Sequence, residues 1–237
     1  SDEKIQKPTA SLKRVIANLP GKIPENPLYE ALPLARHNSS ESCRNSNFQD
    51  PLASALCSEK NMNVLLILLE SFRASDIDSY GSELGLTPNF GKWKQKGIFF
   101  NNFYANGFQT RHAEIAAYCS VMPNYGESVF SHYNSNHFLC LPEILRRKGY
   151  STSWINGADA AYDNQLTMFP KIGFQKIIDR FDFPSDTETL GWGFSDEALF
   201  EKWIKLLDQE KEPFFSSALT TTNHHPFDVP EKFQRFE

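Results

Sequence analysis

The stretch "NVLLILLES", residues 63–71, decides the fold that the sequence predicts. Its apolar run is short and continuous, which is typical of a central strand buried on both faces of a parallel sheet. The run ends abruptly on Glu70 and Ser71. In open α/β sheets, ligands bind beyond the carboxyl ends of the strands. A carboxylate at this place can hold a metal, but it can also be hydrated or cap the following turn.

The sequence after this run alternates between strand and helix patterns. Helices are expected to start at Pro or at a Ser or Thr cap and to stop near Gly, and Ser195 is the expected cap of the last one. The expected helices are 87–97, 141–149 and 196–209, and the expected strands are 98–105, 150–156 and 213–222. This alternation predicts an α/β fold with a doubly wound, mostly parallel sheet and helices on both faces.

The first 60 residues differ from the rest because they are rich in proline and end in a long polar run. One short amphipathic helix is expected at 11–19. We interpret residues 1–60 as a connecting arm and residues 61–237 as the domain that carries the site. The chain opens with "SDEKIQK" and has no starting Met, so we interpret it as part of a longer protein.

Composition excludes several classes of function. The 237 residues are 40% hydrophobic and carry a net charge of −5. The hydrophobic content predicts a globular core, and the acidic balance gives no electrostatic basis for a nucleic-acid partner. No run reaches the roughly 18–20 apolar residues that span a bilayer.

Four cysteines, Cys43, Cys57, Cys119 and Cys140, are spread along the chain without a CxxC pair, which argues against a structural zinc site. Pairing of nearest neighbours gives two disulfides, Cys43–Cys57 and Cys119–Cys140, and would suit an oxidising compartment. Two other pairings, or four free thiols in a reducing compartment, are also compatible with the sequence.

The segment "GFQTRHAEIAAYCSVMP", residues 107–123, places Thr110 at the start of a helical pattern. Free backbone N–H groups and the helix dipole favour an anion at such a position. Thr110 can be a simple N-cap, with Glu114 adding electrostatic support near the first turn. It can also be a hydroxyl nucleophile, activated by a divalent metal ion that Glu70 helps to hold.

Two further segments bring polar residues to the same edge of the predicted sheet. "TTTNHHPF", residues 220–227, follows a strand, and at most one of its two adjacent histidines is expected to face the site. His224 is the candidate. Asp159 follows the strand at 150–156 and is another carboxylate expected at this edge.

From about residue 63 to 227, the chain resembles the sulfatase/alkaline-phosphatase-like superfamily, and it is most similar to the lipoteichoic acid synthase and phosphoglycerol transferase branch. The resemblance is carried by "NVLLILLES", "TPNFGKW", "FFNNFYANGFQTRHAE", "LPEILRRKGYSTSWING", "GWGFSDE" and "PFFSSALTTTNHHPF". It implies an alkaline-phosphatase-like fold. It also implies that Glu70 and Thr110 are metal ligands and that Thr110 is the nucleophile. His224, Asp159 and Asn156 are implied at the substrate head group.

The resemblance further implies a phosphotransferase that depends on Mn²⁺ or Zn²⁺ and works through a covalent intermediate on Thr110. Such an enzyme moves a phosphoglycerol or phosphoethanolamine head group from a membrane phospholipid to a glycan or lipid of the cell envelope. The parent protein is expected to be membrane-anchored, with its catalytic domain outside the cytoplasm or in the periplasm.

The chain departs from the family pattern at two places. It has no Asp-His pair, which in the family completes the metal site, so the C-terminal part of the domain and the remaining ligands are expected beyond Glu237. The chain alone is therefore expected to be inactive. The family's head-group subsite carries a His, a Trp and an Arg, and the matching places here hold Asn156, Asp163 and Gln165.

Two alternatives remain open. A sulfuric or phosphoric ester hydrolase is one, but "TRHAE" lacks the C/S-x-P-x-R pattern of the sulfatases proper. A catalytically inactive domain that binds an envelope glycan or another partner is the second. The absent Asp-His pair favours this second interpretation, whereas the presence of Glu70, Thr110 and His224 favours an enzyme.

Overall fold

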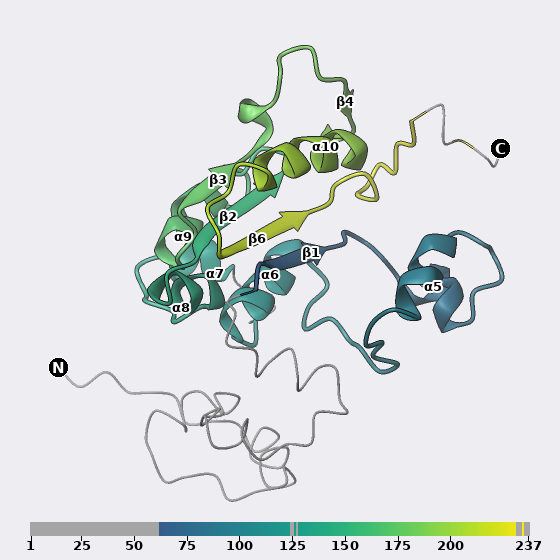
Figure 1. Cartoon of the computed structure of the whole chain (residues 1–237), viewed down its shortest axis with the longest axis horizontal. Helices are drawn as coiled ribbons and strands as arrows, with labels where there is room; N and C mark the ends of the chain where they lie inside the picture. The colour runs from purple at the N-terminus through teal and green to yellow at the C-terminus, as the bar shows by residue number, and fades with distance from the viewer. Residues whose placement is uncertain (1–61, 124–125, 127, 231–233, 235–237) are drawn as a thin grey trace, which may run out of the picture. The chain divides into compact units, whose positions relative to one another are not determined.

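A computed structural model of the chain describes residues 62–123, 126, 128–230 and 234. These residues form a four-stranded sheet in the order β1-β6-β2-β3 (Figure 1). The strands are β1 (Val64–Leu68), β6 (Phe214–Leu219), β2 (Ser151–Asn156) and β3 (Lys176–Ile178). Every pairing is parallel, so all four strands end at one edge of the sheet. The predicted parallel α/β fold is confirmed.

Helices cover both faces of this sheet, as predicted. The helices of the first face are α6 (Thr110–Cys119), α7 (Val129–His132), α8 (Leu141–Arg147) and α9 (Gln165–Lys171). The opposite face is covered by α10 (Asp196–Leu207), which Figure 1 shows on the other side of the strands from α6 and α8. Ser195 caps α10 through its Oγ, which accepts a hydrogen bond from Ala198 N at 3.3 Å.

The two cores follow from the alternation of side chains along each strand. On the first face, Trp154 and Phe215 are fully buried against Phe169 of α9 and its neighbours. On the second face, the neighbouring residues Ile155 and Ala218 pack against α10. The central strands β2 and β6 therefore have apolar contacts on both sides.

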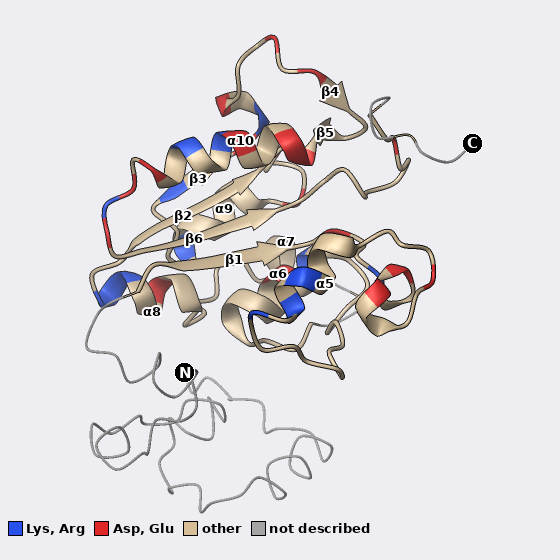
Figure 2. Ribbon diagram, turned by 45° about the vertical axis from the view of Figure 1, so that its right-hand side comes forward, with Lys and Arg blue, Asp and Glu red and all other residues tan. Residues whose placement is uncertain are grey.

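Strand β1 differs from the prediction of a strand buried on both faces. Val64, Leu66 and Leu68 pack against the first core, but Leu65 and Ile67 on the opposite face are 51% and 42% exposed. No described element covers this second face, and no described strand pairs with the free edge of β1. Figure 2 shows that β1 also lacks charged residues, which commonly protect an edge strand.

The segment 98–105 is not a strand, contrary to the prediction. Phe100, Phe103 and Tyr104 are 65–79% exposed. Aromatic residues favour strands, but a strand also needs a neighbour for its backbone groups. Within the described part of the chain this segment has none. Phe99 instead packs on Tyr80, whose hydroxyl donates to Phe100 O at 2.6 Å.

The remaining elements are short. They are α5 (Pro88–Lys94), the 3-10 helices η1 (Ala74–Asp76), η2 (Asp78–Tyr80) and η3 (Arg180–Asp182), and the antiparallel pair β4 (Thr189–Leu190) and β5 (Gly193–Phe194). Helix α5 starts at Pro88 as predicted, but Thr87 makes no side-chain cap. Its hydroxyl instead accepts from Asp78 N, which ties α5 to η2.

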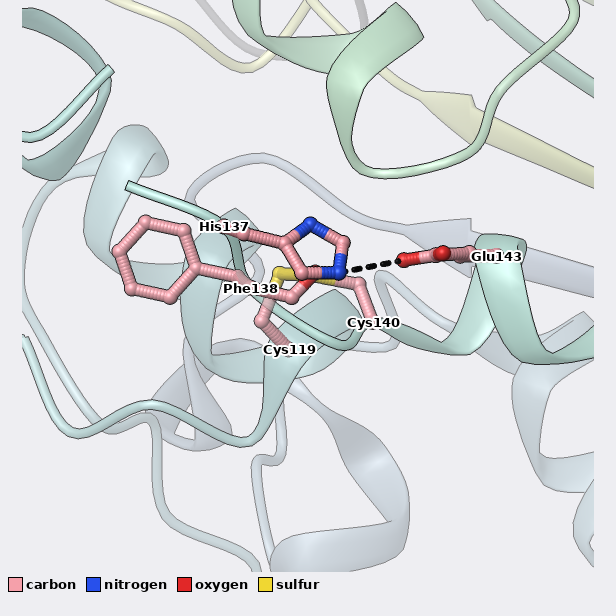
Figure 3. Close-up of a disulfide and its surroundings, with 5 residues drawn as sticks. All are labelled: Cys119, His137, Phe138, Cys140 and Glu143. Carbon is pink, nitrogen blue, oxygen red and sulfur yellow. Dashed lines mark hydrogen bonds and ion pairs between the residues drawn. A yellow bond between two sulfur atoms is a disulfide. The ribbon is translucent and has the colours of Figure 1, made fainter. Parts of the chain in front are cut away.

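A disulfide joins Cys119 at the end of α6 to Cys140 just before α8, as predicted (Figure 3). Figure 3 also shows His137 directed toward Glu143, with its Nε2 atom 3.6 Å from Glu143 Oε2. The bridge fixes the C-terminal end of α6, the helix that begins at Thr110, against the start of α8. The predicted Cys43–Cys57 disulfide and the helix at 11–19 lie outside the described residues.

The exposed face of β1 leads to a prediction about solubility. Ile67→Lys adds a charge to an exposed apolar face at an open edge, so we expect weaker self-association and a change in unfolding free energy within about 0.5 kcal/mol. Leu66→Lys is the matched control, because it directs the same charge into the first core and should destabilise the fold several-fold more. Sedimentation velocity and urea unfolding measure the two effects. Equal destabilisation by both variants would contradict the exposure of Ile67.

Candidate active site

A cavity of about 460 Å³ lies at the edge where the parallel strands end. All five residues that the sequence singled out line it: Glu70, Thr110, Asn156, Asp159 and His224. They come from the ends of β1, β2 and β6, from the loops that follow, and from the start of α6. The fold therefore brings these residues to one place. His225 does not line the cavity, in agreement with the expectation that one histidine at most faces the site.

Glu70 and Thr110 are in direct contact. Thr110 Oγ1 donates a hydrogen bond of 2.8 Å to Glu70 Oε2. Ser71 Oγ donates to the other carboxylate oxygen, Oε1, at 3.1 Å. The backbone N–H of Glu70 donates to Thr220 Oγ1 at 2.8 Å, which links the end of β1 to the residue that follows β6. The carboxylate is thus held at both oxygens, with the threonine hydroxyl at one of them.

The chain turns sharply directly after Glu70. Ser71 has a φ of 50°, in the left-handed region that a residue with a side chain seldom adopts. Asn223 supports this conformation, because its Nδ2 donates to Ser71 O at 2.8 Å. Left-handed backbone at a non-glycine residue costs roughly 1 kcal/mol or more and is concentrated at functional sites. The turn takes the chain away from β1 and leaves the Glu70 side chain facing Thr110.

Thr110 is the first residue of α6 and does not cap it. The N-cap is Gln109, which has extended backbone geometry and makes no side-chain cap. The interpretation of Thr110 as a simple N-cap is therefore wrong. Its hydroxyl instead donates a hydrogen bond to Glu70. Thr110 lies at the helix N-terminus, where the helix dipole favours a negatively charged group.

Glu114 lies one helical turn after Thr110 and is fully buried. Its Oε2 accepts from Gln165 Nε2 at 2.8 Å, whereas Oε1 has no hydrogen-bond partner among the described residues. The pKa of Glu114 is raised to about 8, mainly by burial; the hydrogen bond from Gln165 opposes this rise, and the nearby Asp163 and Glu70 add to it. Glu114 is therefore neutral at pH 7 and does not give the electrostatic support to α6 that the sequence suggested.

The residues after β2 form one wall of the cavity. Asn156 Nδ2 donates to Leu219 O at 2.9 Å, and its Oδ1 accepts from Ala158 N at 2.7 Å. Its amide thus links β2 to β6 and shapes the following turn. Asp159 Oδ1 accepts from Ala161 N at 2.8 Å. Asp163 is paired with Arg111, whose Nη1 lies 3.4 Å from Asp163 Oδ1.

Among the residues that line the cavity, sequence reasoning did not single out the large side chains of Tyr162, Arg180 and Trp192. For Trp192, the sequence feature that could have indicated its position is the pair of glycines on either side of it. Gly191 has a φ of 57°, and a Cβ on Gly193 would lie 2.5 Å from Gly157 O. A Gly-Trp-Gly sequence thus indicates a tight turn that brings the indole to the site. Tyr162 and Arg180 carry no comparable pattern.

The described residues offer part of a metal site. Glu70 and Thr110 supply two oxygen donors 2.8 Å apart, which is compatible with joint ligation of one divalent cation. No group of three His, Cys, Asp or Glu residues that could hold a metal ion occurs in the part of the chain described here. The pair fits as two ligands of a larger set.

The raised pKa of Glu114 predicts how stability depends on pH. Glu114 keeps its proton in the folded protein up to about pH 8 but loses it near its ordinary value of 4.5 when unfolded. The folded state therefore binds more protons in this range, and stability falls as pH rises, by at most about 1.4 kcal/mol per pH unit. Glu114→Gln preserves the hydrogen bond to Gln165 and does not titrate.

Urea unfolding of both proteins at pH 5, 6, 7 and 8 tests this dependence, because titration of all other groups cancels in the difference. With each increase in pH, we expect the unfolding free energy of Glu114→Gln to rise relative to that of the natural protein. If the unfolding free energies of the two proteins changed with pH in the same way, Glu114 would be ionised in the folded protein, which would contradict its raised pKa.

Comparison with known proteins assigns the chain to a family. The Sulfatase family profile matches residues 62–237, which is most of the chain. Lipoteichoic acid synthase 1 of Bacillus subtilis is 30% identical over 201 residues, which cover 82% of this chain and 32% of that protein. The chain thus spans about a third of the length of this relative.

Solved structures share the fold. A protein of the alkaline phosphatase superfamily from Vibrio parahaemolyticus superposes with a TM-score of 0.69 at 31% identity, over 75% of this chain and 45% of that one. The lipoteichoic acid synthase LtaP from Listeria monocytogenes gives a TM-score of 0.66 at 24% identity, with the same coverage. The chain belongs to the sulfatase family, and its similarity lies with the lipoteichoic acid synthase and phosphoglycerol transferase branch of that family.

Proposed function

We propose that the parent protein is a metal-dependent phosphotransferase of the cell envelope. It moves a phosphoglycerol or phosphoethanolamine head group from a membrane phospholipid to an envelope glycan or lipid. The observation that carries this proposal is the hydrogen bond of 2.8 Å between Thr110 Oγ1 and Glu70 Oε2 at the start of α6. The family membership and the relatives named above support the reaction class.

Thr110 acts as the nucleophile in a reaction of two steps. Its oxygen forms a bond to phosphorus while the bond between phosphorus and the lipid alcohol breaks, and the hydroxyl proton ends on the leaving alcohol. An acceptor hydroxyl then attacks the same phosphorus, and Thr110 regains its proton. The N-terminus of α6 stabilises the negative charge that builds up on the phosphoryl oxygens.

Glu70 has two roles in this scheme. As the acceptor of the Thr110 hydrogen bond, it orients the hydroxyl toward the cavity. Together with Thr110, it would also hold the expected Mn²⁺ or Zn²⁺. A divalent cation bound there lowers the pKa of the hydroxyl and polarises the phosphoryl group. The remaining ligands would come from outside the described residues.

The location proposed is outside the cytoplasm, with the parent protein anchored in the membrane. The Cys119–Cys140 disulfide supports an oxidising compartment such as the periplasm. Among the described helices, none is both long and apolar enough for a membrane crossing.

A second candidate is a binding domain without catalytic activity. Its support is that the described residues supply only two of the ligands that a catalytic metal ion requires. It predicts that Thr110 and Glu70 tolerate substitution without loss of function.

Thr110→Ala in the full-length parent should abolish transfer, and Glu70→Gln should abolish transfer and lower the metal content. The melting temperature of Thr110→Ala should change little, because the hydroxyl does not cap α6. Thr110→Ser should keep measurable activity, and Thr167→Ala, which removes an exposed hydroxyl from α9, should keep full activity. Fluorescent phosphatidylglycerol and phosphatidylethanolamine report release of the lipid product. A normal rate in Thr110→Ala would eliminate the assignment of the nucleophile.

A further inference from the structure

Three aromatic rings form a continuous row along the cavity. The ring centroids of Tyr162 and Trp192 are 5.3 Å apart, with an angle of 82° between the ring planes. Trp192 and His224 are 5.0 Å apart at 50°. The three residues come from the loops after β2, between β4 and β5, and after β6, and all line the cavity that contains Thr110. Three separate loops thus bring aromatic rings together beside the nucleophile.

These rings are accessible and are not part of either core. Tyr162 is 73% exposed and Trp192 is 48% exposed, whereas Trp154 and Trp203 are buried in the two cores. The tight Gly-Trp-Gly turn holds the indole there, because Gly193 packs closely on Gly157. A large apolar ring held at the wall of a polar cavity has no role in stabilising a core, and it is suited to contact a ligand.

The charges around the row have both signs. Asp159 lines the cavity, and its Oδ2 has no partner among the described residues because only Oδ1 accepts from Ala161 N. The charge of Asp163 is balanced by Arg111. Arg180 also lines the cavity and has no carboxylate partner within the described part of the chain. The wall therefore offers, in addition to the rings, one carboxylate and one guanidinium that form no ion pair among the described residues.

We propose that Tyr162, Trp192, His224 and Asp159 form a subsite for the ammonium group of a zwitterionic head group of the phosphoethanolamine type. The proposal rests on the proposed function and narrows its substrate. Aromatic faces and a carboxylate together bind an ammonium group by cation–π and ionic attraction. Arg180 attracts the phosphate side of the same head group. A glycerol head group has only neutral hydroxyls and gains neither the cation–π nor the ionic contact.

Competition between two donors tests the subsite in the full-length parent. Phosphatidylethanolamine and phosphatidylglycerol are mixed in one vesicle, and the ratio of their kcat/KM values is measured. We expect the ratio to favour the ethanolamine lipid by about tenfold or more. Trp192→Ala and Asp159→Asn should each lower the ratio about tenfold, and Trp192→Phe should keep most of it. Trp93→Ala, on the exposed helix α5, is the matched control and should leave the ratio unchanged.

The ratio separates the subsite from general damage, because a misfolded variant loses both activities together. A ratio near one, or a preference for the glycerol lipid that Trp192→Ala does not change, would overturn the subsite. Transfer that depends on Thr110 would then still support the proposed function.

If no donor is turned over, titration calorimetry with free phosphoethanolamine and free glycerol phosphate decides the question. Selective binding of phosphoethanolamine that is lost in Trp192→Ala would support the subsite while the proposed function fails. Equal binding of both compounds, or none, would overturn the subsite. Binding of a neutral sugar in preference to phosphoethanolamine would also overturn it and assign the aromatic row to a glycan acceptor.

Discussion

The parallel pairing of β1 with β6 is the constraint on which the site depends. Its register places Leu68 beside Leu219, and Thr220 N donates to Leu68 O at 3.1 Å. The next contact in the same direction is from Glu70 N to Thr220 Oγ1. The hydrogen bonds of the sheet thus extend into the site and fix the backbone of Glu70. Without this pairing the carboxylate would not be held opposite Thr110.

The sequence predicts the fold class and the position of the site because both depend on local patterns. Apolar runs that end in polar residues mark the strands, and parallel strands necessarily bring those ends to one edge. Glu70 and His224 can therefore be placed together from the sequence pattern, because each follows a strand. Thr110 follows no strand, so its place beside Glu70 comes from its position at a helix start and from the family resemblance. The Cys119–Cys140 bridge agrees with the nearest-neighbour pairing, although the sequence alone does not distinguish that pairing from the two others.

The features that sequence reasoning got wrong depend on partners that a local pattern does not reveal. The apolar run of β1 has the same composition whether one face or two are covered, and in the described residues α10 covers only the strands beside it. Residues 98–105 have the aromatic and apolar composition of a strand, but no described strand pairs with them. Trp192, Tyr162 and Arg180 are separated by 12 to 30 positions in the sequence, and only the tertiary fold brings them to one cavity.

The covalent intermediate on Thr110 is the central claim, and mass spectrometry tests it most directly. The full-length parent is mixed with phospholipid donor in the absence of acceptor, quenched in acid and digested. The account predicts that the peptide with Thr110 gains the mass of one phosphoryl head group and that fragmentation places this mass on the threonine. A head group found on another residue, or steady turnover with no adduct on this peptide, would contradict the account.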